Sequence, residues 1–276
     1  MHFRSFASPS FTWGSLLLLS WSGVACSNNT ENDRPAYDGG GCDSSCGTDG
    51  AVGFSDGDDA GSGGAGGGGG VSATGSVVAF ADTGFVTTSP VTEGLTVRAE
   101  PAVGAAWIST TYDGTSFDLT GVARGDAVWM AADSADTTQY FVTITRQDTS
   151  KNKALSLPLM KADLIETIYN VSGASDTISA ADAQLVVQLV DNNGAGIAGV
   201  TTTVAGASFV AYSEANTWQL VLTETSSDGQ AFFGNIPAAK FPGGEIELAL
   251  GGNLVRTLPV VVAANAVTVV RIVASP

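Results

Sequence analysis

The chain has 276 residues, of which 27 are acidic and 11 are basic, and its formal net charge is −16. From Ser76 onward there are 9 basic and 19 acidic residues, so this part alone is near −10. Such a surface repels phosphate backbones, and we therefore expect no nucleic-acid partner. The single histidine is His2, so the rest of the chain cannot provide Ser-His-Asp or Cys-His chemistry or a histidine zinc site.

An apolar run near the N-terminus, residues 14–25, ends at Cys26. The run is too short to span a bilayer and is typical of an export signal, so residues 1–25 are predicted to be a signal peptide. Its end, Gly23-Val24-Ala25-Cys26, resembles a bacterial lipobox, in which the cysteine is lipidated and becomes the mature N-terminus. The resemblance implies a lipid anchor at Cys26 and a location in the cell outer membrane or at the cell surface. Plain cleavage after Ala25, giving a periplasmic or secreted protein, is the alternative.

Residues 26–75 are predicted to form a disordered tether. Between Gly39 and Gly70 lie 15 of the 35 glycines, and such a segment buries too little apolar surface to offset the entropy lost on ordering. Asp56, Asp58 and Asp59 would suit a calcium loop. The EF-hand spacing and its closing glutamate are missing, however, so a solvated acidic tether is favoured.

Cys42 and Cys46 are predicted to form a small disulfide loop within this tether. Lipidation of Cys26 leaves these two as an even pair, and an exported protein reaches an oxidising compartment. A redox or metal pair is the alternative. It is disfavoured because the spacing is one residue longer than Cys-x-x-Cys and no βαβ pattern surrounds it.

From residue 76 onward, apolar residues recur with a period of two in short stretches bounded by turn residues: 95–99, 117–119, 140–145, 218–222, 246–250 and 267–273. This pattern predicts an all-β fold with two tandem antiparallel β-sandwich domains, at 76–172 and 182–275. Residues 160–169 depart from it, because Leu164, Ile165 and Ile168 have helical spacing. A short helix is predicted there, with a further strand and its linker as the alternative.

Two Asp-Gly pairs, Asp113-Gly114 and Asp228-Gly229, each precede a short alternating strand and are predicted to form hairpin turns. Together with the glycine-rich turn at 191–200, the second pair makes residues 182–275 resemble the carboxypeptidase regulatory-like family of transthyretin-like sandwiches. Residues 76–158 share mainly the Asp-Gly element. The resemblance implies a non-catalytic β-sandwich module of exported bacterial proteins, of a kind that usually accompanies another activity.

Three tryptophans, Trp107, Trp129 and Trp218, lie in predicted strands, where a large ring normally fills the core. A carbohydrate-stacking platform is the alternative. Asp113 and Asp228 are expected to serve their own turns, with a carboxylate pair or a metal site as the alternative. Glu245 and Glu247 are expected on the solvent-exposed face of their strand.

The period-two registers also predict which residues of the C-terminal part face inward. Ten positions on the more apolar strand faces are expected in the core: Leu185, Val187, Leu189, Trp218, Leu220, Leu222, Phe233, Ile246, Leu248 and Leu250.

These patterns predict a lipid-anchored cell-envelope protein with a non-catalytic binding or scaffolding role, and no enzyme. We expect no catalytic residue, no metal and no cofactor. The expected partners are the membrane, through the lipid anchor, and a protein or carbohydrate at the envelope. A surface protein with a carbohydrate or peptide site on a sheet face or in the loops is the alternative. A calcium-assisted hydrolase using aspartates is a further one.

Overall fold

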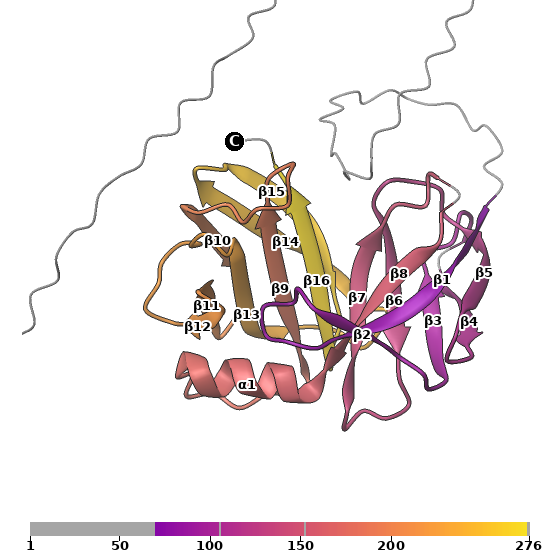
Figure 1. Ribbon diagram of the computed structural model, residues 1–276, viewed down its shortest axis with the longest axis horizontal. Coiled ribbons are helices and arrows are strands. Elements are labelled where there is room, and N and C mark those ends of the chain that lie inside the picture. Colours follow the sequence, from indigo (N-terminus) through magenta and orange to yellow (C-terminus); the bar gives the residue numbers. More distant parts are fainter. Residues whose placement is uncertain (1–69, 105, 152, 275–276) are drawn as a thin grey trace, which may run out of the picture. The chain divides into compact units, whose positions relative to one another are not determined.

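The structure is a computed structural model that describes residues 70–274 except 105 and 152. The predicted signal peptide, Cys26 with its lipid, the Cys42–Cys46 pair and the tether aspartates lie outside the described residues. The described part is all-β, as predicted, with one helix (Figure 1).

The elements of its first half are β1 (Val71–Phe80), β2 (Thr88–Pro90), β3 (Leu95–Ala99), β4 (Ile108–Tyr112), β5 (Phe117–Val122), β6 (Val128–Asp133), β7 (Tyr140–Gln147), β8 (Leu155–Lys161) and α1 (Ala162–Ser172). The second half contains β9 (Asp182–Val190), β10 (Val200–Val204), β11 (Phe209–Glu214), β12 (Thr217–Gln219), β13 (Gln230–Pro237), β14 (Gly244–Gly252), β15 (Arg256–Val262) and β16 (Ala266–Val273).

The first half is a row of strands in the order β5-β1-β8-β7-β6-β3-β4, and its two end strands, β4 and β5, lie against each other. Alternate residues point to the inside of this curled row. Val77, Val97 and Leu157 are completely buried there. In strands such as β3 and β5 the period-two pattern of the sequence corresponds to one buried face, whereas Val128–Ala132 of β6 are buried on both faces.

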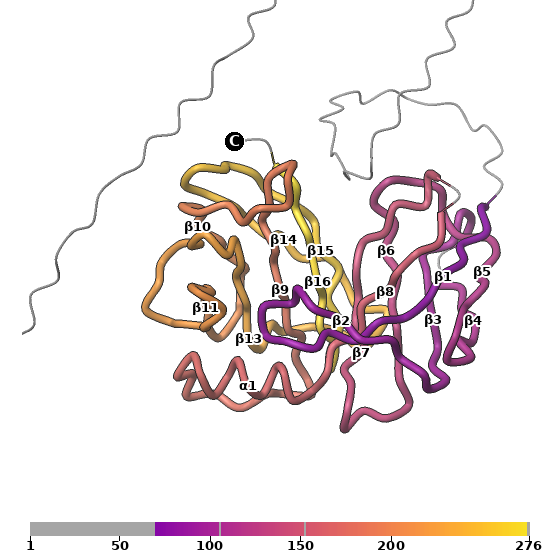
Figure 2. Tube along the Cα trace, viewed as in Figure 1, coloured from indigo at the N-terminus to yellow at the C-terminus, as the bar shows by residue number. Residues whose placement is uncertain are grey.

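The second half is a β-sandwich with a helix on its outer side. The strands β12-β11-β13-β9-β16 pack one face against a separate sheet, β10-β14-β15, and Leu185, Leu248 and Val260 meet in the core between them. The opposite face is covered by α1, which the trace in Figure 2 shows leading from β8 towards β9. Ile165 and Ile168 of this helix are buried against that face.

The two halves share one sheet, because β16 runs parallel to β9 on one side and to β7 on the other. The first two residues of β7 pair with β8, and Val142–Thr145 pair with β16. A third parallel pair joins β1 to β8, so the sheets are mixed rather than wholly antiparallel as expected. The division into domains at 76–172 and 182–275 stays a prediction.

A helix is present where one was predicted at 160–169, although it begins and ends later. Met160 and Lys161 still belong to β8, and α1 ends at Ser172, before Gly173 in the left-handed conformation at φ 78°. Glycine favours this C-terminal position because it adopts positive φ without steric cost. The three residues that predicted the helix are all buried.

Seven of the ten residues predicted to face inward are buried, and Ile246 is half-buried. Leu220 is 36% exposed and Leu222 is half-buried, because β12 ends at Gln219 and a loop follows. The predicted strand at 218–222 is therefore wrong beyond Gln219. Hydrogen bonding explains the early end, since only Thr217–Gln219 find partners, on β11.

Side chains form hydrogen bonds with backbone groups of both edge strands of the three-stranded sheet. On β10, the buried Tyr212 hydroxyl accepts a hydrogen bond from the Thr202 N–H at 3.0 Å and lies 3.3 Å from the Thr202 carbonyl oxygen. On β15, the Arg146 guanidinium donates to the Pro259 carbonyl at 2.9 Å. Edge strands with unpaired backbone groups invite pairing with other chains, and these contacts reduce that risk.

We predict that Tyr212→Phe lowers the free energy of unfolding by about 1–3 kcal/mol, because it leaves buried backbone groups of Thr202 without a partner. Urea denaturation would measure this loss. Tyr140→Phe is the matched control: Tyr140 is half-buried, so the change should cost less than about 0.5 kcal/mol. Equal effects of the two changes would contradict this role of Tyr212.

Candidate functional site

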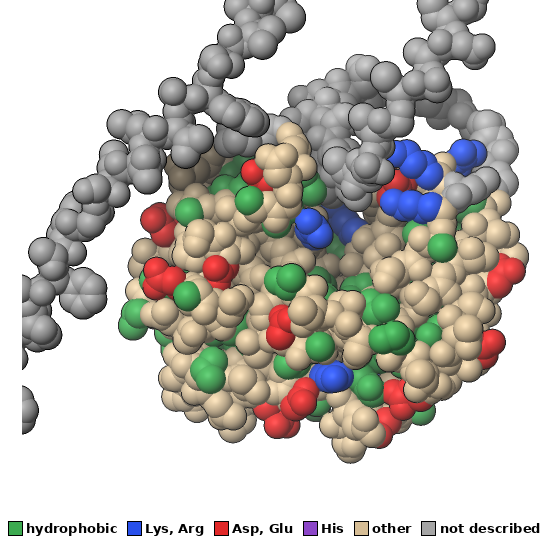
Figure 3. All heavy atoms as spheres, viewed as in Figure 1, with side chains coloured by type: hydrophobic (Ala, Val, Ile, Leu, Met, Phe, Trp, Pro, Cys, Tyr) green, Lys and Arg blue, Asp and Glu red, His purple; other side chains and the backbone are tan. Residues whose placement is uncertain are grey.

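A cleft of about 570 Å³ opens where the parallel strands β7 and β16 separate. Their pairing ends at Thr145 and Val269, after which β7 continues beside β6 and β16 continues beside β9. Figure 3 shows lysine and arginine side chains around a hollow in this face of the molecule. The separation of two neighbouring strands therefore creates the cleft.

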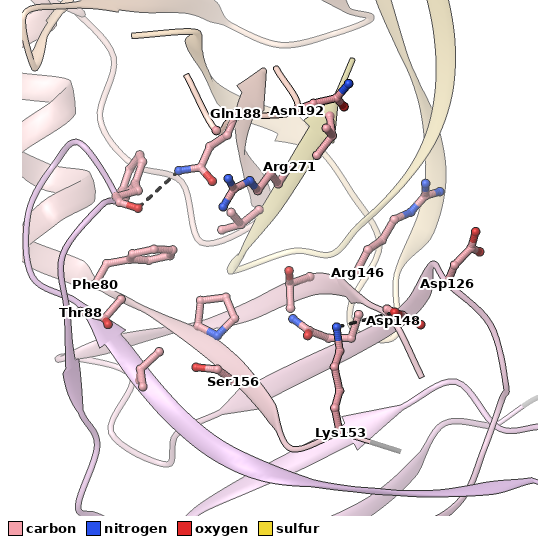
Figure 4. A pocket seen from close by; sticks show the side chains of 18 of the residues that line it. Phe80, Thr88, Asp126, Arg146, Asp148, Lys153, Ser156, Gln188, Asn192 and Arg271 are labelled. Atoms are coloured by element: carbon pink, nitrogen blue, oxygen red, sulfur yellow. Dashed lines mark hydrogen bonds and ion pairs between the residues drawn. The ribbon is translucent and has the colours of Figure 1, made fainter. Parts of the chain in front are cut away.

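The floor of the cleft is polar because it lies beyond the part of the sheet that α1 and its apolar core cover. Along β16, Val267 and Val269 are buried in the core that α1 covers. Arg271, two residues further on the same face of the strand, is exposed. Gln188 of β9 is the register partner of Arg271. Figure 4 shows Arg271 and Gln188 side by side in the cleft.

One wall of the cleft is apolar and the other is a turn. Val78 of β1 and Pro158 of β8 are register partners, both half-buried, and they line the cleft with Phe80. Residues 191–194, the turn that follows β9, line the opposite side. An apolar surface thus faces a polar turn across the floor.

The loop between β1 and β2 closes one end of the cleft and binds the two halves together. The side chains of Trp218 and Gln230 donate hydrogen bonds to the carbonyls of Thr83 at 3.0 Å and Gly84 at 2.6 Å. Gln188 donates to the carbonyl of Phe85 at 3.4 Å.

Phe85 anchors this loop through its ring, despite a strained backbone. It has φ 53°, which is uncommon for a bulky residue. Its ring is buried, with its centroid 5.3 Å from that of Phe80 and 5.9 Å from that of Trp218. The apolar contacts hold the residue in this conformation.

Two acidic residues of the cleft are bound within their own turns. Asp191 accepts backbone hydrogen bonds from Ala195 and Asn193, each at 2.8 Å. These bonds, led by that from Ala195, hold the pKa of Asp191 below its usual value, although desolvation acts in the opposite direction. The hydrogen bond from the Ser150 hydroxyl is the main cause of the lowered pKa of Asp148, with desolvation again opposing it.

The basic residues of the cleft differ in how far they are neutralised. Arg146 lies 4.6 Å above the Trp129 ring, and burial lowers the pKa of its guanidinium. Lys153 forms an ion pair with Asp148 at 3.6 Å. Within residues 70–274, less the two omitted positions, no carboxylate forms an ion pair with Arg271. Arg271 is therefore the cleft cation whose charge a ligand can use.

The three tryptophans do not come together. Trp129 and Trp218 are buried in different cores, and Trp107 is half-buried with its ring edge-on to Phe241 at 5.0 Å. They fill or flank the core, as predicted, and they form no shared stacking platform.

The two aspartates of the Asp-Gly pairs have different roles. Asp113 accepts hydrogen bonds from the N–H groups of Thr115 and Ser116 and so serves its own turn. Asp228 instead accepts from the Ser213 hydroxyl at 2.6 Å and the Asn216 N–H at 2.8 Å, which fixes the turn between β11 and β12. The prediction that Asp228 serves its own turn is wrong, because this neighbouring turn offers donors within reach.

The predicted hairpins at these pairs are also wrong. The turn at Asp113 joins β4 to β5, yet β4 pairs with β3 and β5 pairs with β1. The strand that follows Gly229, β13, pairs with β11 and β9 rather than with β12. At the first pair β4 and β5 lie against each other without pairing, and at the second the chain passes to the other side of β11; the local turn signal can reveal neither arrangement. Glu245 and Glu247 are exposed, as predicted.

Among the described residues, no group of three or more histidine, cysteine, aspartate or glutamate side chains is placed to hold a metal ion. Nor is any helix of that part long and apolar enough to cross a bilayer. Sequence reasoning missed the cleft. One signal for it was available, since Arg271 is the single charge in the apolar stretch at 267–273.

No protein-family model and no curated protein matches the chain. Among solved structures, it is similar to a streptococcal ancillary pilin at 10% identity, over 73% of this chain and 68% of that one, with a TM-score of 0.24. The Bacillus anthracis TIE protein is 12% identical over 74% of this chain and 34% of that one, with a TM-score of 0.21. The major pilin protein of Streptococcus pyogenes is 8% identical over 75% of this chain and 96% of that one, with a TM-score of 0.19. Similarity at this level carries no argument about function.

Proposed function

We propose that the protein is a non-catalytic binding protein of the bacterial cell envelope, anchored by lipid at Cys26. The chemistry of the cleft supports binding over catalysis. Its lining offers an exposed guanidinium, amides and hydroxyls; of its three aspartates, Asp126 is exposed, and Asp148 and Asp191 are held in the ionised form by their turns. A carboxylate with a lowered pKa is a weak proton acceptor and cannot act as a general acid near neutral pH.

We also propose that residues 182–275 are a carboxypeptidase regulatory-like module. Two sheets packed face to face, with the turn at Asp191 closing the first strand, support this assignment. In such a module the sandwich acts as a rigid support and the loops and sheet faces carry recognition. The cleft lies at the edge of this module, next to the first half.

The anchor is tested by the change Cys26→Ser. We expect the wild-type protein to fractionate with membranes and partition into detergent, and the variant to move to the soluble fraction, because an acyl chain supplies most of the binding energy. Cys42→Ser is the matched control and should stay with the membranes. A wild-type mature terminus without lipid in mass spectrometry would overturn the anchor and favour a secreted or periplasmic protein.

A further inference from the structure

We propose that the cleft binds a carboxylate-bearing sugar residue, with Arg271 holding the carboxylate. The inference deepens the proposed binding function and rests on it in that respect. It is independent of how the protein is attached to the envelope.

Arg271 supplies the positive charge that a carboxylate needs. The part of the chain from Ser76 is near −10, whereas the cleft lining balances three basic residues against three acidic ones, and no ion pair engages Arg271 within the described residues. Arginine binds carboxylates through two parallel hydrogen bonds, which fix orientation as well as adding affinity. The guanidinium also lies against the turn after β9, since a Cβ atom added to Gly194 would be 3.5 Å from its Nη2 atom. Arg271 thus lies at one side of the cleft, beside this turn.

The residues around Arg271 supply hydrogen-bonding groups and an apolar surface. Gln188 and Gln147 on the floor, with Ser156 and Thr88 on the walls, bring amides and hydroxyls to one cavity. Amides and hydroxyls can both donate and accept hydrogen bonds, which is what sugar hydroxyls require. The apolar wall of Val78 and Pro158 offers a surface for the C–H face of a sugar ring. The combination matches a ligand with one carboxylate, several hydroxyls and one apolar face.

The size and shape of the cleft suit a compact ligand. A volume of about 570 Å³ lies within the range of small-molecule sites. An acidic peptide would instead favour a long unpaired strand edge. Here β16 is paired with β9 from Val267 to Val273, and on the β7 side it is unpaired only past Val269. A compact acidic sugar therefore fits the cleft better than an extended peptide does.

Calorimetric titration of the purified full chain tests the proposal. The probes are trigalacturonate, a neutral galactose trimer and a triglutamate peptide. We expect trigalacturonate to bind at least about tenfold more tightly than either of the others, because each lacks one part of the recognition. Arg271→Gln should weaken trigalacturonate binding by about tenfold or more, and Arg271→Lys should retain part of the affinity.

Lys240→Gln is the matched control, because Lys240 is exposed, lies outside the cleft lining and carries the same charge. It should leave the affinity unchanged within about twofold. The melting temperature of Arg271→Gln should match that of the wild type, which separates lost binding from lost folding. No binding of trigalacturonate, equal binding of the neutral trimer, tighter binding of the peptide, or equal losses in Arg271→Gln and Lys240→Gln would each overturn the proposal. Fractionation of Cys26→Ser does not depend on this result, so the two proposals fail separately.

Discussion

Leu248→Ala is expected to lower the free energy of unfolding by about 2–5 kcal/mol, the usual cost of removing a fully buried leucine side chain. Leu248 is completely buried between the two sheets of the sandwich, opposite Leu258 on β15. β14 is hydrogen-bonded to β15 on one side and to β10 on the other. The cavity left by the missing side chain therefore cannot close by a simple shift of one strand. The cost should therefore lie in the upper part of this range.

Urea denaturation at equilibrium measures the effect, with the slope of the transition checked for two-state behaviour. Glu247→Ala is the matched control, one residue away on the exposed face of the same strand, and should change stability by less than about 0.5 kcal/mol. Similar losses for the two variants would contradict the register of β14.

Gly229→Ala is expected to be about as damaging, for a different reason. Gly229 has φ 64°, and a Cβ atom there would lie 2.1 Å from the carbonyl oxygen of Leu189 and 2.7 Å from the Cα atom of Gly196. Both obstacles are backbone atoms. The Leu189 N–H also donates to the Gly229 carbonyl at 2.7 Å, so relief of the clash would disturb the contact between β9 and the start of β13.

Gly173→Ala separates the clash from the unfavourable backbone conformation. Gly173 has φ 78°, similar to that of Gly229, but nothing lies within 4 Å of an added Cβ atom. This control should cost about 1–2 kcal/mol for a left-handed residue with a side chain, whereas Gly229→Ala should cost at least about 3 kcal/mol, because strain and overpacking add. Thermal or urea unfolding gives both values, and a difference below about 1 kcal/mol would show that the close approach is unimportant.

Much of the local structure could be predicted from the sequence, because many strands show their buried face through alternation, although β6, β9, β13 and β16 are buried on both faces. The same alternation predicted that Leu248 is buried and Glu247 exposed, and it failed at Leu220, where no partner strand is available. The helical spacing of Leu164, Ile165 and Ile168 likewise gave the one helix. These signals are local, and so is the physics that they report.

The pairing of distant strands could not be predicted in this way. Nothing near β16 in the sequence indicates that it inserts between β7 and β9, and the cleft exists because β7 and β16 then separate. The role of Asp228 depends on Ser213 and Asn216, which reach it only through the fold. Side-chain chemistry was visible in the sequence, but its assembly into a site requires the tertiary structure.

The most direct test of the proposed ligand site is a crystal structure of the full chain with trigalacturonate. The account predicts a sugar carboxylate about 3 Å from the guanidinium nitrogens of Arg271, with the ring between the amides of the floor and the wall of Val78 and Pro158. Trigalacturonate bound at another surface, or a cleft that stays free of it at saturating concentration, would contradict the account.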